Sequence, residues 1–208
     1  MKRVLLYFIG LNLIALGVVL NIRWNLGVAA FSSVMYSTSM IFKISLGTAS
    51  IFFYLLFVFV QIILSRKITM NFILEIPLSF AFGWLTDLYD FMIPTFELTF
   101  ILKVLLFILT MFITALGVFL TVCSNLVLTP TDGIVKTISE VFHIVFSKVK
   151  NCFDISLVLI TIALCLIYQK PFYGIGIGTL ISALFLGRII HLLENTKLNN
   201  LFINEKSS

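Results

Sequence analysis

The sequence predicts an all-α, polytopic membrane protein that forms a single integral membrane domain over residues 1–208. Hydrophobic residues make up 61% of the chain and charged residues 11%, whereas soluble domains average about 45–50% and about 25%. Several uncharged runs approach or exceed the ~20 residues that a helix needs to cross a bilayer. This composition excludes a water-soluble enzyme, a disordered tail and a free nucleic-acid-binding domain, and it makes the lipid bilayer the first expected partner.

Six strongly apolar runs are predicted to be membrane helices: residues 4–22, 44–65, 68–86, 104–131, 155–169 and 171–187. The first follows Met1-Lys2-Arg3, which resembles the start of a signal peptide. No small-residue cleavage site follows this run, so we expect an uncleaved span. The third run contains Glu75 and Pro77, and proline is tolerated in membrane helices when neighbouring groups satisfy the freed carbonyl.

Two further segments have a mixed character and raise the upper count to eight helices. Residues 24–42 carry no charge, but their apolar character is diluted by Asn25 and by several Ser and Thr residues. Residues 131–150 include several charges and place apolar residues at helical spacing, which predicts one amphipathic helix. Either segment crosses the bilayer beside a polar cavity, re-enters it or lies in its interface, and periodicity does not choose among these.

The two mixed segments occupy equivalent positions in an internal repeat. Ala15-Leu16-Gly17-Val18 and Asn25-Leu26 recur 100 residues later as Ala115-Leu116-Gly117-Val118 and Asn125-Leu126. The sequence therefore divides into repeat 1 (about 4–92), repeat 2 (about 98–193) and a tail at 195–208. Four spans in each repeat would make the halves parallel, whereas three would give them inverted topology. We favour three, with six full spans and two short embedded or interfacial helices.

The charges indicate orientation in the membrane and not nucleic-acid binding. The formal net charge is +5, from 14 Lys and Arg against 9 Asp and Glu, and the basic residues lie mostly between the apolar runs. Since cytoplasmic loops carry the basic excess in membrane proteins, both termini are expected in the cytoplasm.

No catalytic or metal-binding pattern stands out, so we expect no enzyme, no metal and no cofactor. The three cysteines form no C-x-x-C pair, and Glu140-x-x-His143 is not the H-E-x-x-H motif of zinc enzymes. There is no Walker motif either, so any transport would be secondary or powered by a partner.

Four ionisable residues are candidates for a substrate or proton pathway: Asp132, Lys136, Asp154 and Arg188. Ionisable side chains inside membrane segments are costly, and a functional role is their default interpretation. Structural alternatives remain open. Asp132 is also a candidate N-cap for a helix beginning near Gly133. Asp154 also fits a carboxylate near a helix start, and Arg188 fits a helix end that reaches towards water.

Other polar residues and the glycines are interpreted as structural. Arg23 and Glu75 are expected to anchor helices, with a pathway role as the alternative. Asp87 and Asp90 are expected to be solvated near a helix end. Seven glycines are expected to allow close helix packing: Gly17, Gly83, Gly117, Gly174, Gly176, Gly178 and Gly187.

Taken together, these motifs resemble the YczE/YyaS/YitT family of bacterial multi-pass membrane proteins. The second half carries the more specific elements, Pro130-Thr131-Asp132, Phe153-Asp154-Ile155 and Gly174-Ile175-Gly176-Ile177-Gly178-Thr179. The similarity covers roughly residues 5–193 and implies a location in the bacterial cytoplasmic membrane, without an established activity. One departure is Ala30-Phe31-Ser32, which stands where family members often carry a second P-x-D.

The leading functional hypothesis is secondary transport of a small solute through a polar path between the two repeats. Short polar helices at equivalent positions of two repeats are the sequence sign of a site near the bilayer midplane. Asp132 and Asp154 would bind a cationic group or a proton, with Lys136 and Arg188 as counter-charges. The alternative is a non-transporting membrane regulator or assembly factor that acts through a protein partner, and a homo-oligomer is also left open.

Overall fold

A computed structural model describes residues 2–124 and 126–194, and this part of the chain is helical with no strand. Its eight helices are α1 (Lys2–Trp24), α2 (Ala30–Phe42), α3 (Leu46–Ser65), α4 (Met70–Met92), α5 (Phe100–Ser124), α6 (Pro130–Phe142), α7 (Phe146–Ile167) and α8 (Ile177–Glu194). The expected cytoplasmic tail at 195–208 and Asn125 of the repeated motif lie outside the described residues.

Five of these helices are long and apolar enough to cross a membrane: α1, α3, α4, α5 and α7. The sixth expected span corresponds to α8, whose apolar part is shorter and covers Ile177–Ile190. The two short helices, α2 and α6, have 13 residues each. At 1.5 Å per residue each is about 20 Å long, which is less than the hydrocarbon core of about 30 Å. Neither short helix is therefore a full span.

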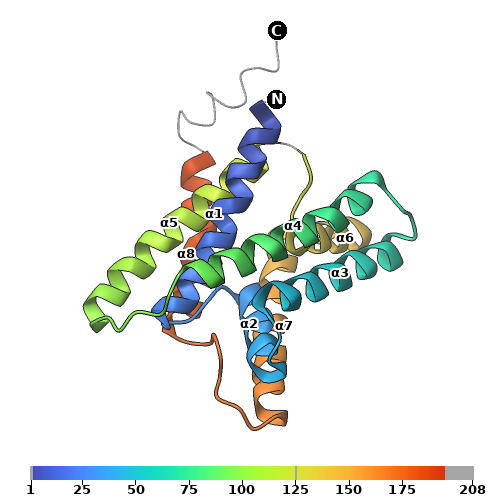
Figure 1. Ribbon diagram of the computed structural model, residues 1–208. Helices are drawn as coiled ribbons and strands as arrows, with labels where there is room; N and C mark the ends of the chain where they lie inside the picture. Colours follow the sequence, from blue (N-terminus) through green and yellow to red (C-terminus); the bar gives the residue numbers. More distant parts are fainter. Residues whose placement is uncertain (1, 125, 195–208) are drawn as a thin grey trace.

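Helices α1 and α5 pack side by side over most of their length and run in opposite directions (Figure 1). Gly10 of α1 lies against Gly117 of α5, and Gly17 of α1 lies against Thr114, so the residue numbers increase in opposite directions. The indole Nε1 of Trp24 donates a hydrogen bond of 2.8 Å to Thr110 Oγ1. This pair of helices joins the first half of the chain to the second.

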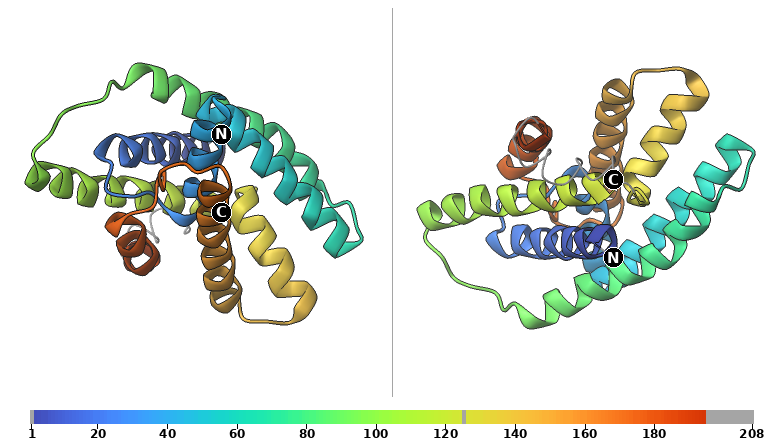
Figure 2. Two further views of the ribbon diagram at one scale, coloured as in Figure 1. Left: turned by 90° about the horizontal axis from the view of Figure 1, so that it is seen from below. Right: turned by 90° about the horizontal axis from the view of Figure 1, so that it is seen from above.

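Of the remaining helices, α4 and α8 pack on this pair, and α2, α3, α6 and α7 form a group to one side of it (Figure 2). Helix α2 crosses α7, and α6 crosses α3, so each short helix packs on a long helix of the other half. Helix α4 packs on both α3 and α1. Helix α8 packs on α5 but makes no comparable contact with α7. The fourth helix of each half is thus placed differently.

The segment 131–150 is not one amphipathic helix, and that expectation was wrong. Helix α6 ends at Phe142, and His143 adopts the left-handed conformation with φ of 54°. The Ser139 hydroxyl donates a hydrogen bond of 2.6 Å to the carbonyl of Ile144, which holds the break. The first half has the same break: Lys43 has φ of 54°, and the Ser39 hydroxyl donates to the Ile44 carbonyl at 2.7 Å.

The break moves the start of α7 to Phe146, so the charged residues at 148–154 belong to a long apolar helix. The last expected span also differs from the structure. Residues 171–176 form a connection in which Gly174 has φ of 73°, and α8 begins only at Ile177. Both corrections move helix boundaries by several residues, because turn geometry and not hydropathy sets them.

Asp87 and Asp90 have protein partners, so the expectation of simple solvation was wrong. The carboxylate of Asp87 accepts hydrogen bonds from Gly47 N at 2.6 Å and from Ser45 Oγ at 2.7 Å, at the start of α3. Asp90 Oδ1 forms an ion pair of 2.8 Å with Arg23 Nη2. The Arg23 guanidinium also donates to the carbonyls of Asp90 and Ile93, and it thereby ties the end of α1 to the end of α4.

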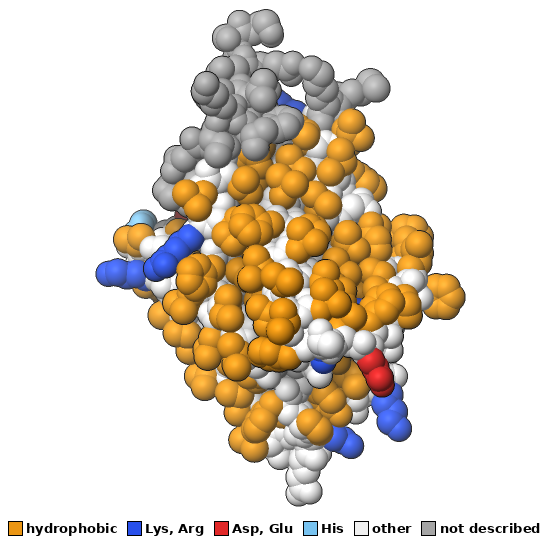
Figure 3. All heavy atoms as spheres, turned by 90° about the vertical axis from the view of Figure 1, so that its left-hand side faces the viewer, with side chains coloured by type: hydrophobic (Ala, Val, Ile, Leu, Met, Phe, Trp, Pro, Cys, Tyr) orange, Lys and Arg blue, Asp and Glu red, His pale blue; other side chains and the backbone are white. Residues whose placement is uncertain are grey.

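The surface agrees with a bilayer environment. On the face shown in Figure 3 most side chains are hydrophobic, and the charged side chains lie mainly towards its margins. Large exposed apolar residues such as Phe52, Phe59, Ile101 and Leu159 occur along the long helices. In water such an extended apolar surface would be unfavourable. The protein is an integral membrane protein built as a helical bundle.

Candidate functional site

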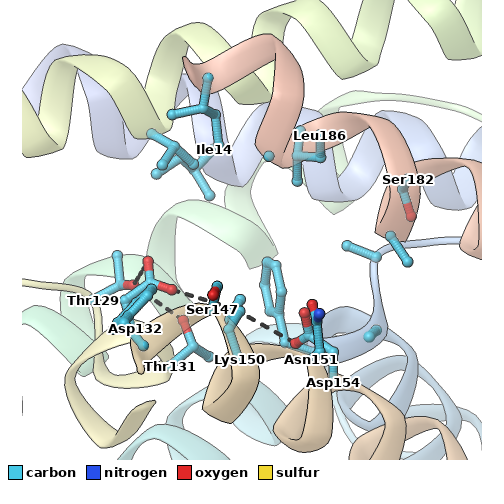
Figure 4. A pocket seen from close by; sticks show the side chains of 18 of the residues that line it. Ile14, Thr129, Thr131, Asp132, Ser147, Lys150, Asn151, Asp154, Ser182 and Leu186 are labelled. Atoms are coloured by element: carbon cyan, nitrogen blue, oxygen red, sulfur yellow. Dashed lines mark hydrogen bonds and ion pairs between the residues drawn. The ribbon is translucent and has the colours of Figure 1, made fainter. Parts of the chain in front are cut away.

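A cavity of about 310 Å³ lies where α8 stands away from α7. One wall is the N-terminal half of α7 with the first turn of α6, and the opposite wall is α8 (Figure 4). Most of the remaining lining is apolar, with Ile14 of α1, Phe31 of α2 and Val118 of α5 among the side chains. The cavity therefore presents a small polar region inside an apolar enclosure, which is typical of small-molecule sites.

The polar region is a cluster of three charged side chains, Asp132, Lys150 and Asp154. The ammonium of Lys150 lies between the carboxylates, 3.2 Å from Asp132 Oδ1 and 3.5 Å from Asp154 Oδ1. All three side chains are largely buried, with exposed fractions of 24–29%. One carboxylate in this cluster remains without a full positive counter-charge, so the cluster favours a further cation or a proton.

Asp154 is the less satisfied of the two carboxylates. Its Oδ1 is buried, and the contact with Lys150 lacks hydrogen-bond geometry, so this oxygen accepts no hydrogen bond from the described residues. A buried charged oxygen without a donor is costly. Asp154 lines the cavity beside Asn151 (Figure 4), but its Oδ1 is shielded from the cavity and lies 3.5 Å from the Lys150 ammonium.

Asp132 is held by the start of α6. The helix begins at Pro130 with Thr129 as its N-cap residue, so Asp132 lies in the first turn and is not the cap itself. Proline suits this first position because its missing N–H would have no helical partner there. The Thr129 hydroxyl donates to Asp132 Oδ2 at 3.2 Å, which orients the carboxylate towards Lys150. The Asp132 charge also lies near the positive end of the helix dipole.

The opposite wall is contributed by one face of α8. Ser182, Leu186 and Gly187 line the cavity there, and Tyr54 of α3 lines it from another side. Ser182 donates its hydroxyl back to the Thr179 carbonyl at 3.0 Å. The wall of α8 is thus mainly apolar, and recognition of charge depends on α6 and α7.

The model of one family matches residues 1–195, which is nearly the whole chain. The chain belongs to DUF6198, a family of unknown function. No curated protein and no solved structure matches it. The chemistry of this DUF6198 protein must therefore be argued from its own residues.

The DUF6198 chain brings two of the four candidate pathway residues together, Asp132 and Asp154. Lys136 lies on another face of α6, lines a second cavity and pairs with Glu140 at 3.9 Å. Arg188 is exposed near the end of α8, with its guanidinium carbon 5.6 Å from the centre of the Phe185 ring. Neither Lys136 nor Arg188 lines the cavity between α7 and α8.

Sequence reasoning missed Lys150 and Tyr54. Lys150 was placed at the end of an amphipathic helix, whereas it lies in the second turn of α7. The signal was present, because Lys150 and Asp154 are four residues apart and such pairs share one helix face. Tyr54 gave no signal, because it is one of many aromatic residues in an apolar helix.

Three of the seven glycines sit at close helix contacts. A Cβ at Gly117 would lie 2.8 Å from the carbonyl oxygen of Gly10, and one at Gly17 would overlap Thr114 Oγ1. A Cβ at Gly83 would overlap Ile51. Gly187 differs, because a Cβ there would meet no atom within 4 Å.

Gly174, Gly176 and Gly178 approach the connection between α1 and α2, and two of them also approach helices: Gly174 lies against Tyr36 of α2 and Gly178 against Phe107 of α5. Their segment exchanges backbone hydrogen bonds with the connection between α1 and α2: Val28 N donates to the Gly174 carbonyl at 2.9 Å, and Gly178 N donates to the Leu26 carbonyl at 2.7 Å. Gly27 in that loop has φ of 118°, which favours glycine. We name these two paired segments, residues 26–28 and 174–178, the loop junction.

Proposed function

We propose that this protein carries out secondary transport of a small solute with a positively charged group, which binds in the cavity between α7 and α8. The observation that carries the proposal is the cluster of Asp132, Lys150 and Asp154 on the cavity wall. Charged residues are rarely kept inside membrane proteins unless they serve a pathway. Two carboxylates against one ammonium leave the cluster with an excess negative charge, which would attract the positive group of the solute.

Two inverted repeats form part of this proposal. The bounds of α6 lie 100 residues after those of α2, and α7 begins 100 residues after α3. The contacts of α2 with α7 and of α3 with α6 exchange under this displacement. The antiparallel packing of α1 and α5 favours an axis in the membrane plane, as in transporters with inverted repeats.

The proposed setting is the bacterial cytoplasmic membrane, with both termini in the cytoplasm. It rests on the family resemblance and on the excess of Lys and Arg over Asp and Glu. The protein would act without a cofactor and without catalysis, and a gradient of ions would drive the solute.

The test uses purified protein in liposomes adsorbed to a solid-supported membrane. Four cationic probes are applied in turn: methylammonium, guanidinium, choline and putrescine. We expect at least one probe to give a transport current with the wild type. The double variant Asp132→Asn/Asp154→Asn should reduce that current by at least about tenfold, the effect of about 1.4 kcal/mol in binding.

The matched control is Glu97→Gln, which removes an exposed carboxylate from the connection between α4 and α5, outside this cavity. It should retain the wild-type current. A wild type that gives no current with any of the four probes, or a double variant that keeps the full current, would overturn the assignment of a cationic solute to this cavity.

A non-transporting regulator is the second candidate, and one observation favours it. In the most apolar stretch of α7, only 17% of the residues are buried inside the protein, against 39–50% in the corresponding stretches of the other four long helices. An uncovered helix of this kind offers a surface for another membrane protein. This candidate expects no current for any probe and a partner that crosslinks to α7 in membranes. Crosslinking from an exposed position such as Leu159 distinguishes it from lipid contact alone.

A further inference from the structure

A second cavity, of about 360 Å³, lies on the other side of α6. It is bounded by α3, α4, the connection before α6 and α6 itself, and Thr121 of α5 lines both cavities. Its polar side chains include Gln61, Asn71, Glu75, Lys136, Thr137 and Glu140. The first turns of α6 therefore separate two polar cavities.

Glu75 is the central group of this second cavity. Glu75 is 2% exposed and Gln61 is 0% exposed, and both are polar residues in largely apolar helices. Gln61 Nε2 donates to Glu75 Oε2 at 2.7 Å, and Thr137 Oγ1 donates to Gln61 Oε1 at 3.3 Å. Three helices thus contribute to one buried hydrogen-bonded chain that ends at a carboxylate.

The approach of α6 to this carboxylate depends on Gly133. A Cβ at that position would lie 2.6 Å from Glu75 Oε1 and 2.9 Å from Gln61 Oε1. No other side chain would leave the two oxygens where they are. The glycine therefore allows the backbone of α6 to close over the Glu75 carboxylate without filling the cavity.

No positive side chain among the described residues pairs with Glu75. The nearest ammonium on the cavity wall, that of Lys136, contacts Glu140 instead, and both of these side chains are more than half exposed. An ionised carboxylate buried in this way needs a compensating positive charge. Because no described residue supplies this charge, it must come from outside that part of the chain.

Two buried tyrosines lie close to the two cavities. The Tyr7 hydroxyl of α1 is buried without a hydrogen-bond partner among the described residues and lies within electrostatic range of Glu75. Tyr54 of α3 is fully buried and lines the cavity between α7 and α8.

We propose that the cavity between α3, α4 and α6 binds one small positive charge, a hydrogen ion or an alkali-metal ion, at the Glu75 carboxylate. The oxygen atoms of Gln61 and Thr137 complete the polar surroundings. The site faces Tyr7 from α1 and Lys136 and Glu140 from α6. Binding at Glu75 requires no transported solute. The proposal of an ion site can therefore fail or hold independently of the proposed solute cavity.

The test measures the melting temperature, Tm, of the purified protein in detergent, in choline chloride and in the chlorides of lithium, sodium and potassium at equal ionic strength. The pH is then varied in choline chloride alone. A ligand that binds only the folded state raises Tm. With an alkali-metal ion as ligand, Tm should rise by about 5 °C at saturation. With a hydrogen ion as ligand, the salts are equivalent and Tm depends on pH.

The variant Glu75→Gln should abolish whichever dependence the wild type shows. Asp154→Asn is the matched control: it removes a buried carboxylate from the other cavity and should keep the dependence. If Glu75→Gln follows the wild type in every salt and at every pH, the proposal is overturned. Loss of the dependence in Asp154→Asn but not in Glu75→Gln would also overturn it and assign the effect to the cluster.

Poor folding of Glu75→Gln does not remove the test. Dicyclohexylcarbodiimide adds to protonated carboxyl groups in apolar surroundings, and mass spectrometry locates the adduct in wild-type protein. We expect an adduct at Glu75 that an alkali-metal ion suppresses, or one that forms at neutral pH in every salt if the ligand is a hydrogen ion. No adduct at Glu75 at any pH would refute the site.

Discussion

The first half of the chain, residues 2–92, and the second half, residues 100–194, fold into the same four helices but place the last helix differently. In the first half α4 packs along α3, whereas in the second half α8 leaves α7 and packs only on α5 among the long helices. The cavity of about 310 Å³ occupies the space that α8 leaves beside α7. The two halves thus differ in the position of their last helix, and the cavity lies where α8 does not pack on α7.

The charged residues at this site also have no charged counterparts in the first half. Asp132, Lys150 and Asp154 correspond, by the displacement of 100, to Ser32, Ser50 and Tyr54. In the first half the equivalent positions are buried and uncharged. Where a fourth helix covers the long helix, charge is absent; where it does not, charge is retained. At these three positions the first half is uncharged, and the charged cluster belongs to the second half.

The largest effect is expected at the contact that joins the halves. Gly117→Leu should prevent α1 and α5 from packing and cost at least about 3 kcal/mol, because the added side chain meets the backbone of Gly10. Gly187→Leu, where a Cβ meets nothing within 4 Å, should leave Tm nearly unchanged. Fluorescence-detected size-exclusion chromatography and thermal unfolding measure both. Equal losses of stability in the two variants would show that the two glycines are packed alike.

A change to the cluster tests whether the charge of the second half is balanced. Lys150→Met leaves Asp132 and Asp154 without their shared ammonium, and we expect a loss of about 2 kcal/mol in unfolding free energy. Adding Asp154→Asn to Lys150→Met should recover part of it. Lys148→Met, at an exposed position of the same helix, is the control. A neutral Lys150→Met would mean that the cluster is solvated and not coupled.

Equivalent helix crossings in the two halves should respond unequally. Gln61→Leu removes the donor to the buried Glu75 and should cost about 2 kcal/mol. Thr161→Val, at the equivalent position, loses the 3.1 Å contact with the Ser33 hydroxyl and the 2.9 Å hydrogen bond to the Leu157 carbonyl, and it should cost about 1 kcal/mol. Urea unfolding in detergent measures the difference, and a larger loss for Thr161→Val would contradict it.

The smallest effect is expected at the breaks that follow the short helices. Ser39→Ala should cost about 1 kcal/mol, because this hydroxyl bonds to the Ile44 carbonyl in a largely buried position. Ser139→Ala removes the same bond at a more exposed position and should cost about 0.5 kcal/mol. Hydrogen exchange at Ile44 and Ile144 reports each break separately. Faster exchange at Ile144 than at Ile44 in the paired variants would reverse the expected order.

Much of the helical framework follows from the sequence, because uncharged runs and lipid exposure are directly related. The two short helices were visible as polar segments at equivalent positions. Their ends were not, since the break at His143 depends on a left-handed residue and one serine hydroxyl. Hydropathy carries no information about such a turn.

The site was only half visible in the sequence. Asp132 and Asp154 were identifiable as charges in apolar surroundings, but their shared partner Lys150 became apparent only once α7 was extended to Phe146. The burial of Glu75 with Gln61 depends on which face of α6 crosses α3, and one sequence does not determine a helix crossing. Contacts between halves were the part that sequence reasoning could not supply.

The loop junction has a consequence for how the protein is made. Residues 26–28 obtain their backbone partners from residues 174–178, which the ribosome adds about 150 residues later. Until then the Leu26 carbonyl and the Val28 N–H lack these bonds, and such groups are costly away from water. The first connection of the chain therefore stays in an unfinished form throughout translation. The connection that leads into α2 is therefore completed only when residues 174–178 have been made. A chain shortened before residue 174 should be recognised by membrane quality control as incomplete.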